Sequence, residues 1–227
     1  MVTNAPPSKA DGNTTAAIQR RYERQAAIYD LVEVPVELLF HRWRRRFWGL
    51  VPADSRVLEI GVGTGKNLRW HPPHVSVTAV DFSPRMLARA TRRTPRPDAR
   101  PGFAMMDAQA LAFAEASFDV AVATFVFCSV PDPVLGLQEA RRALKPNGRL
   151  LLLEHVRSGL PIVGRCMDWL NPLTVRLQGV NVNRDTVDSV RRAGFRILEI
   201  DDLFMDSVKL IVAEPAPQAN SHFSSGP

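Results

Sequence analysis

A glycine-rich turn after a short apolar segment constrains this chain more than any other feature. Residues 57–67 read Val-Leu-Glu-Ile-Gly-Val-Gly-Thr-Gly-Lys-Asn, which is typical of a strand covered on both faces and followed by a tight turn. Glycines at 61, 63 and 65 can take positive φ and let a ligand touch the backbone. A second apolar segment, 75–80, ends at Asp81. An acid about twenty residues after such a turn is placed to accept hydrogen bonds from ribose hydroxyls.

The spacing of the glycines separates two classes of nucleotide ligand. The dinucleotide pattern is G-x-G-x-x-G, whose amides hold a pyrophosphate. Here the pattern is G-x-G-x-G, and Glu59 precedes it. An acid at that position repels a pyrophosphate and suits an adenosine whose tail carries an ammonium and a sulfonium. A glycine turn without a ligand is the alternative, and it leaves Asp81 unexplained.

With these residues the chain resembles the class I methyltransferases that use S-adenosylmethionine. The resemblance implies that cofactor, with Glu59, Gly61, Gly63, Gly65 and Asp81 among its binding residues. It also implies that Asp107 accepts a hydrogen bond from the adenine amine and that the amide of Ala108 caps a ring nitrogen. Phe82 would pack on the adenine face or in the core, and Thr124 would lie beneath the sulfonium.

Apolar periodicity and turn residues predict alternating strands and helices along the chain. The expected strands are 56–60, 75–80, 102–106, 118–125, 149–155, 195–200 and 207–213. The expected helices are 16–31, 34–50, a short one from about 65, 84–93, 133–144 and 184–193, with a less regular stretch over 158–183. This order predicts an α/β, Rossmann-like fold, with a seven-stranded, mostly parallel sheet and helices on both faces.

The predicted elements divide the chain into one domain with additions at its ends. Residues 51–214 would form the cofactor-binding domain and residues 16–50 an N-terminal helical lid. Residues 1–15 and 215–227 are rich in Pro, Gly, Ser and Asn, and we expect disordered tails there.

Three groups of enzymes within this class share short sequence segments with this chain. Tyr29-Asp30-Leu31 and 41–45 resemble the quinone-biosynthesis C-methyltransferases, and Glu154-His155-Val156 resembles those enzymes, the phospholipid N-methyltransferases and the membrane-associated thiol methyltransferases. The thiol group also shares Cys128-Ser129-Val130. A tyrosine-rich segment of the quinone enzymes is absent. The resemblance implies a lipophilic or membrane-resident acceptor, either a phospholipid amine or a quinone.

Charge gives an independent indication about the acceptor. The net charge is +6, and residues 20–46 hold seven Arg and four acids. On a helix over 34–50, one face carries Val36, Leu39, Phe40, Trp43, Phe47 and Leu50, and the opposite face carries Leu38, His41, Arg45 and Trp48. The second face is that of a helix lying on an anionic membrane, or simply a solvated basic face. Nucleic acid is not an expected partner, because no binding module is recognisable.

The cysteine count and the distribution of apolar residues limit the cellular locations that we expect for the protein. Cys128 and Cys166 form no disulfide framework or metal-ligand spacing, so no metal site is expected. Residues 1–17 lack the apolar core of a secretory signal, and the apolar stretch 120–130 is too short to span a bilayer. We expect a cytoplasmic protein, with peripheral association with the inner face of the membrane as a further hypothesis.

The resemblance and the residue types indicate an enzyme with two candidate catalytic residues. His155, at the end of a central strand, is a candidate for a base or for positioning the acceptor, and hydrogen bonding within the fold is its structural alternative. Tyr29, on the predicted lid, would approach the methyl group. A small soluble acceptor such as a thiol remains the alternative substrate, and a protein that binds S-adenosylmethionine without turnover remains the non-enzymatic alternative.

Overall fold

The computed structural model describes residue 19 and residues 34–94, 101–178, 181–204 and 206–217, with side chains from residue 40 onward in the second of these stretches. The strands are β1 Arg56–Ile60, β2 Ser76–Asp81, β3 Gly102–Met105, β4 Phe118–Thr124, β5 Leu144–His155, β6 Phe195–Phe204 and β7 Val208–Pro215. The helices are α2 Val34–Trp48, the 3₁₀ turn η1 Leu68–Trp70, α3 Pro84–Arg93, α4 Pro133–Ala143, α5 Pro161–Gln178 and α6 Thr186–Arg192.

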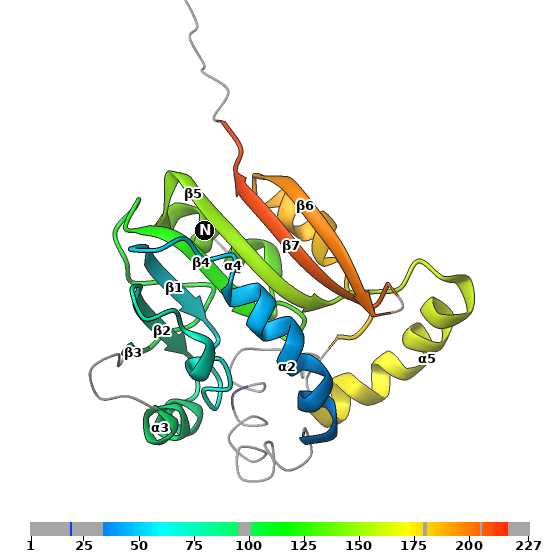
Figure 1. The fold of residues 1–227 in the computed structure, drawn as a ribbon. Helices are drawn as coiled ribbons and strands as arrows, with labels where there is room; N and C mark the ends of the chain where they lie inside the picture. Colours follow the sequence, from blue (N-terminus) through cyan, green and yellow to red (C-terminus); the bar gives the residue numbers. More distant parts are fainter. Residues whose placement is uncertain (1–18, 20–33, 95–100, 179–180, 205, 218–227) are drawn as a thin grey trace, which may run out of the picture.

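The strands form one sheet in the order β3-β2-β1-β4-β5-β7-β6 (Figure 1). The first five run parallel, and β7 lies antiparallel to both β5 and β6. The predicted Rossmann-like, mostly parallel sheet of seven strands is confirmed. Because the parallel strands share one direction, the ends of β1, β2 and β4 meet at a single edge, where ligands bind in such folds.

Each face of the sheet has its own apolar core. Side chains alternate between faces along a strand, so Leu58 and Ile60 join α4 and α6 on one side, and Val57 joins α2 and α3 on the other. The three residues are at most 1% exposed, which fixes β1 at the centre of the molecule. The predicted helices on both faces are therefore confirmed.

Helix α2 packs differently from the prediction for 34–50. Phe40 and Phe47 face the core as expected, but Trp48 is also buried, at 1% exposure, and Leu50 is 37% exposed. The ring of Trp48 lies 4.3 Å from that of His71, centroid to centroid, because α2 contacts both β5 and the segment around η1. The prediction that Trp48 faces solvent or a membrane is wrong. A helical wheel assumes contact on one side, and α2 is contacted on two.

Three other segments depart from the predicted elements. The short helix expected from about residue 65 is limited to the 3₁₀ turn η1, which follows a run of turns. Strand β5 begins at Leu144, five residues before the predicted start at 149, and its register is irregular before Arg149. The stretch 158–183, predicted as irregular, contains the 18-residue helix α5, which accommodates Pro172. None of the described helices is both long enough and apolar enough to cross a bilayer.

Candidate active site

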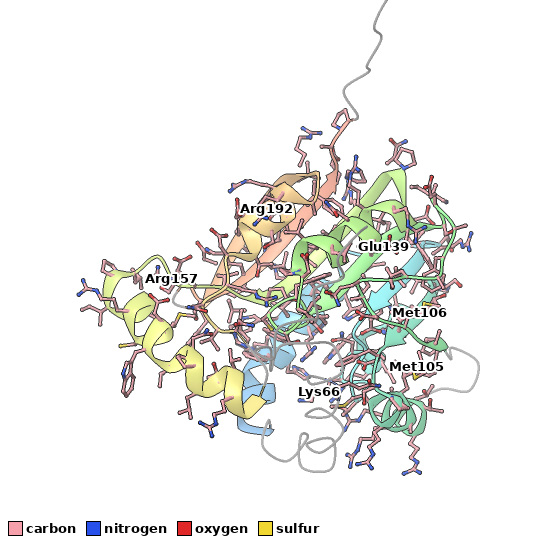
Figure 2. The ribbon with its side chains drawn as sticks, turned by 180° about the vertical axis from the view of Figure 1, so that it is seen from behind. Lys66, Met105, Met106, Glu139, Arg157 and Arg192 are labelled. Atoms are coloured by element: carbon pink, nitrogen blue, oxygen red, sulfur yellow. The ribbon has the colours of Figure 1, made fainter. Side chains whose placement is uncertain are left out.

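A cavity opens at the carboxyl ends of β1, β2 and β4, the edge at which the sheet places its turns. Its walls come from the glycine turn, the segments after β2 and β3, and the loop after β4. The lining residues are Arg44, Ile60–Thr64, Lys66, Asn67, Val80–Phe82, Met86, Met106–Ala108, Thr124–Val126 and Ser129–Pro131. Figure 2 labels Lys66 and Met106, two of these lining residues.

The three glycines of the turn have positive φ but different surroundings. A Cβ at Gly61 would lie 2.4 Å from Val126 Cγ2, and one at Gly65 would lie 2.7 Å from Leu68 Cδ1. A Cβ at Gly63 would meet no atom within 4 Å. Gly61 and Gly65 are therefore required by packing, whereas Gly63 leaves open space beside the cavity.

Asp81 lies at the end of β2 with both carboxylate oxygens on the turn. Its Oδ2 accepts from the amide of Gly63 and its Oδ1 from the amide of Ser83, each at 2.9 Å. Burial raises the pKa of Asp81 to about 6, although backbone amides, those of Ser83 and Gly63 first, favour the ionised form. An ionised carboxylate has about four acceptor sites, so Asp81 keeps acceptor capacity for a ligand hydroxyl.

The residues predicted to bind the adenine ring line the same cavity as Asp81. Phe82, Asp107 and Ala108 all line the cavity. Asp107 Oδ1 accepts from the amide of Gln109 at 2.9 Å, which fixes the carboxylate at the end of β3. The side chain of Gln19 donates to the carbonyl of Phe82 at 2.8 Å, so one residue of the predicted lid touches the cavity wall.

A buried polar network closes the opposite end of the cavity. Arg44 Nη1 donates to Asn67 Oδ1 at 2.7 Å and to Thr124 Oγ1 at 3.0 Å. Asn67 Nδ2 in turn donates to Glu59 Oε1 at 2.7 Å, and His71 Nε2 lies 2.9 Å from Glu59 Oε2. Arg44, Asn67 and Thr124 line the cavity, and Glu59 lies behind them with both oxygens engaged.

Arg44 is among the lining residues that the sequence prediction missed. It is 5% exposed, although it stands in a run of basic residues at 42–46 whose other arginines, Arg42, Arg45 and Arg46, are exposed. Its helical position, four residues after the buried Phe40 and three before the buried Phe47, is the signal that could have separated it from its neighbours.

His155 lies next to the cavity wall but not among the lining residues. Its ring centroid is 4.6 Å from that of Phe125, which lines the cavity, and 5.9 Å from that of Phe40. Burial lowers the pKa of His155 to about 4, so the imidazole is neutral at pH 7. Tyr29, the second candidate catalytic residue, lies outside the described residues.

Glu154, the neighbour of His155 in sequence, supports the wall from behind. Its Oε1 accepts from the amides of Val126 at 2.8 Å and Phe127 at 2.9 Å, and the side chain is fully buried. Burial raises the pKa of Glu154 to about 7. This carboxyl therefore fixes the loop after β4. The sequence analysis named Glu154 only as part of the segment Glu154-His155-Val156 and gave it no role.

Comparison with known proteins identifies the class of site. Residues 58–152 match a family model described as a methyltransferase domain. The chain is 37% identical over 142 residues to a phosphatidylethanolamine N-methyltransferase of Cereibacter sphaeroides, 34% over 157 to a demethylmenaquinone methyltransferase of Deinococcus radiodurans, and 31% over 155 to a thiol S-methyltransferase of Rattus norvegicus. These matches cover 61%, 66% and 65% of the chain, and they span 68%, 65% and 63% of the three relatives.

A solved structure with the same fold is that of an S-adenosylmethionine-dependent methyltransferase from Thermotoga maritima, titled a possible histamine N-methyltransferase. It superposes with a TM-score of 0.68 over 88% of this chain and all of that one, at 22% identity. The open space at Gly63 and the acceptor oxygens of Asp81 fit the adenosine part of that cofactor, and the cationic Arg44 fits a carboxylate tail. The chain belongs to the methyltransferases that use S-adenosylmethionine as the methyl donor.

Proposed function

We propose that the protein transfers the methyl group to a lipophilic, membrane-resident acceptor, with a phospholipid amine as the first candidate and a quinone-type ring as the second. The observation that supports this is the character of the wall after β4. Phe125, Val126, Val130 and Pro131 line the cavity there, with Ser129 as the polar exception. Such a wall suits an apolar acceptor better than a small charged one.

The bound cofactor would contact the polar groups that line the cavity, each with a different part of the molecule. We infer that Asp81 accepts from the ribose hydroxyls, Asp107 and Ala108 bind the adenine edge, and Phe82 packs on its face. Gly63 would let the ribose approach the backbone. The cofactor carboxylate would pair with Arg44, since a guanidinium is the group best suited to a carboxylate at a buried site.

Glu59 would act on the cofactor through Asn67 rather than by direct contact, because both its oxygens already accept or share hydrogen bonds. Thr124, which accepts from both Arg44 and Asn67, would hold the tail end of the site beneath the sulfonium.

The cofactor supplies an electrophilic methyl group on its sulfonium. The protein's task is to place an acceptor lone pair in line with that methyl and to exclude water. Orientation of this kind can lower a barrier by about 7–11 kcal/mol. Phe125 and Val126 are the lining residues best placed to do this, since Glu154 holds the amide of Val126 and His155 packs on Phe125.

The state of His155 favours an amine over a quinol carbon. A ring carbon becomes nucleophilic when a phenol proton is removed, and an imidazole with a pKa near 4 is a weak base for that step. A phospholipid ammonium can lose its proton to water before it enters the site, and the neutral amine then carries its lone pair without a base in the protein. His155 would therefore position the acceptor through Phe125 rather than remove a proton.

Defined acceptors test the proposal with purified full-length protein. S-adenosylhomocysteine formation is measured with vesicles containing phosphatidylethanolamine, with a demethylated menaquinol in detergent, and with a small thiol. We expect turnover with the phospholipid. Turnover with the quinol alone would retain the lipophilic acceptor and replace the amine by a ring carbon. Turnover with the thiol alone, or cofactor binding without any turnover, would contradict the proposal. A cytoplasmic protein that visits the inner membrane surface is the setting that it implies.

A further inference from the structure

Helix α5 is amphipathic, but its orientation is the reverse of the usual one, in which the apolar side of a helix packs on the protein. Its polar residues face the protein: Asp168 pairs with Arg157 and accepts from Asn183, and the side-chain oxygen of Asn171 accepts from the amide of Val182. These contacts attach the helix through hydrogen bonds rather than through an apolar core.

The opposite face of α5 is apolar and open to solvent. Trp169 is 81% exposed, Ile162 77% and Leu173 54%, and the helix lies at the margin of the fold with side chains projecting away from it (Figures 1 and 2). The exposed apolar residues recur at helical spacing and form one stripe, which comprises Ile162, Cys166, Trp169, Leu170 and Leu173. A contiguous stripe of this kind marks a docking surface, since isolated exposed apolar residues do not line up.

The charges beside the stripe are cationic. Arg165 and Arg176 fall along one edge of it, at about 100° per residue, and both are exposed. The single acid of α5 is Asp168, which lies on the inner face and is already paired. Arginines flanking an apolar face with a tryptophan are the arrangement of a helix that lies in a lipid interface, where the cations reach anionic headgroups.

The segment after α5 connects the helix to the apolar cavity wall. Asn181 donates its amide to the carbonyl of Cys128 at 2.9 Å, and the guanidinium of Arg184 donates to the carbonyls of Phe127 and Val130. The same short segment, 181–184, holds α5 through Val182 and Asn183. The exposed stripe and the acceptor wall are thus linked by one hydrogen-bonded unit.

We propose that α5 lies in the surface of an anionic bilayer, with the stripe from Ile162 to Leu173 inserted among the acyl chains and with Arg165 and Arg176 at the headgroups. Docking in this way brings the acceptor wall beside the lipid. The choice of lipid as partner rests on the proposed function, and it replaces the membrane face predicted on α2, from which Trp48 is withdrawn into the core.

Vesicle binding by the full chain tests the surface without reference to catalysis. The probe is vesicles of phosphatidylglycerol and phosphatidylcholine at low salt, in a flotation assay. The test variant is Ile162→Ser with Trp169→Ser, and the matched control is Leu135→Ser with Leu198→Ser, two residues exposed elsewhere on the molecule, on α4 and β6. We expect the test variant to bind at least about tenfold more weakly, and the control to bind like the wild type.

A fluorescence measurement locates the contact. Trp169 is the most exposed tryptophan of the four, so acyl chains carrying bromine should quench wild-type emission and quench Trp169→Phe much less. Absence of wild-type binding, or equal loss of binding in the test and control variants, would overturn the proposal. So would a wild-type dimer that Ile162→Ser with Trp169→Ser dissociates, because the stripe would then be an interface between copies.

Activity on a short-chain, water-soluble phosphatidylethanolamine separates this inference from the proposed function. The test variant should methylate that acceptor at the wild-type rate and lose rate only with vesicles. Binding to vesicles without methylation of any lipid would contradict the proposed function and leave the docking surface standing.

Discussion

Gly63 is the residue that most directly separates ligand binding from folding in the glycine turn. Its neighbours Gly61 and Gly65 face Val126, Leu68 and Ala90, but Gly63 faces open space beside Asp81. We expect Gly63→Ala to lower the affinity for S-adenosylmethionine by at least about tenfold, because the methyl group fills the ribose path. The free energy of unfolding should fall by only about 1–2 kcal/mol, the cost of an alanine with positive φ.

Calorimetric titration and urea unfolding measure the two effects of Gly63→Ala. Gly102→Ala is the matched control, since that position also has no atom near a Cβ and does not have positive φ. Unchanged affinity in Gly63→Ala would contradict the placement of the ribose.

A second prediction at the scale of single residues concerns Glu154 and the pH dependence of the free energy of unfolding. Burial raises the pKa of its carboxyl from 4.5 to about 7 in the folded protein. The folded state therefore holds a proton that the unfolded state releases, and this contribution to stability is lost as the pH rises from about 4.5 to 7. In Glu154→Gln the loss disappears, and the variant keeps an oxygen for the amides of Val126 and Phe127.

The measurement is urea unfolding of both proteins at about pH 5 and pH 8. The wild type minus variant difference should fall by about 2–3 kcal/mol between the two. Taking the difference removes the contributions of Asp81 and His155, which are common to both proteins. A difference independent of pH would show that Glu154 has an ordinary pKa.

Candidate site residues were easiest to place from the sequence where the local chain determines their position. Asp81 ends β2, Asp107 follows β3 by two residues, and both line the cavity, because the carboxyl ends of parallel strands share one edge. Arg44 was not singled out from the basic run around it, although its spacing from Phe40 and Phe47 places it on the buried face of the helix. Its role depends on Asn67 and Thr124, which lie 23 and 80 residues away in the chain.

At the scale of whole elements, α2 matters because it supplies part of the cavity wall. Its Arg44 joins Asn67 and Thr124 in the cavity wall. We expect Arg44→Gln to lower the affinity for S-adenosylhomocysteine by about tenfold or more, because a charge-assisted hydrogen bond to the carboxylate is lost. Affinity for 5′-methylthioadenosine, which has no amino-acid tail, should change little.

The comparison of the two ligands distinguishes binding from structure. Equal losses for both would mean that Arg44 only supports the fold. Arg45→Gln, an exposed neighbour on the same helix, is the control, and Arg44→Lys should recover part of the affinity for the ligand with the carboxylate.

Helices were predicted best where the hydrophobic periodicity and the capping residues at the helix ends agreed. Helix α3 begins after Ser83, whose hydroxyl accepts from the amide of Met86 as an N-cap, and α6 is followed by Gly194 with positive φ. Helix α5 was missed because its apolar stripe faces solvent and its polar residues face inward, and because Pro172 lies within it. The pattern that usually reveals a helix assumes the opposite orientation.

At the scale of the whole molecule, the alternation of strands and helices was enough to predict the sheet. It also placed Asp81 at the end of a strand, where the structure has a cavity. The acceptor was not predictable to the same degree. The cavity combines α2 with the loop after β4, and the segment after α5 holds that loop from outside, so the three are brought together only by folding. The division into a lid at 16–50, a domain at 51–214 and two tails stays a prediction; β7 reaches Pro215.

The central claim is methyl transfer to a lipophilic acceptor, and one experiment addresses it without choosing the acceptor beforehand. Purified protein is incubated with S-adenosylmethionine that carries a labelled methyl group and with a cell extract, which is then separated into lipid and aqueous fractions. We predict label in the lipid fraction, with chromatography distinguishing phospholipid from quinone, and much less label with Gly63→Ala. Label confined to the aqueous fraction would contradict the account and indicate a small soluble acceptor.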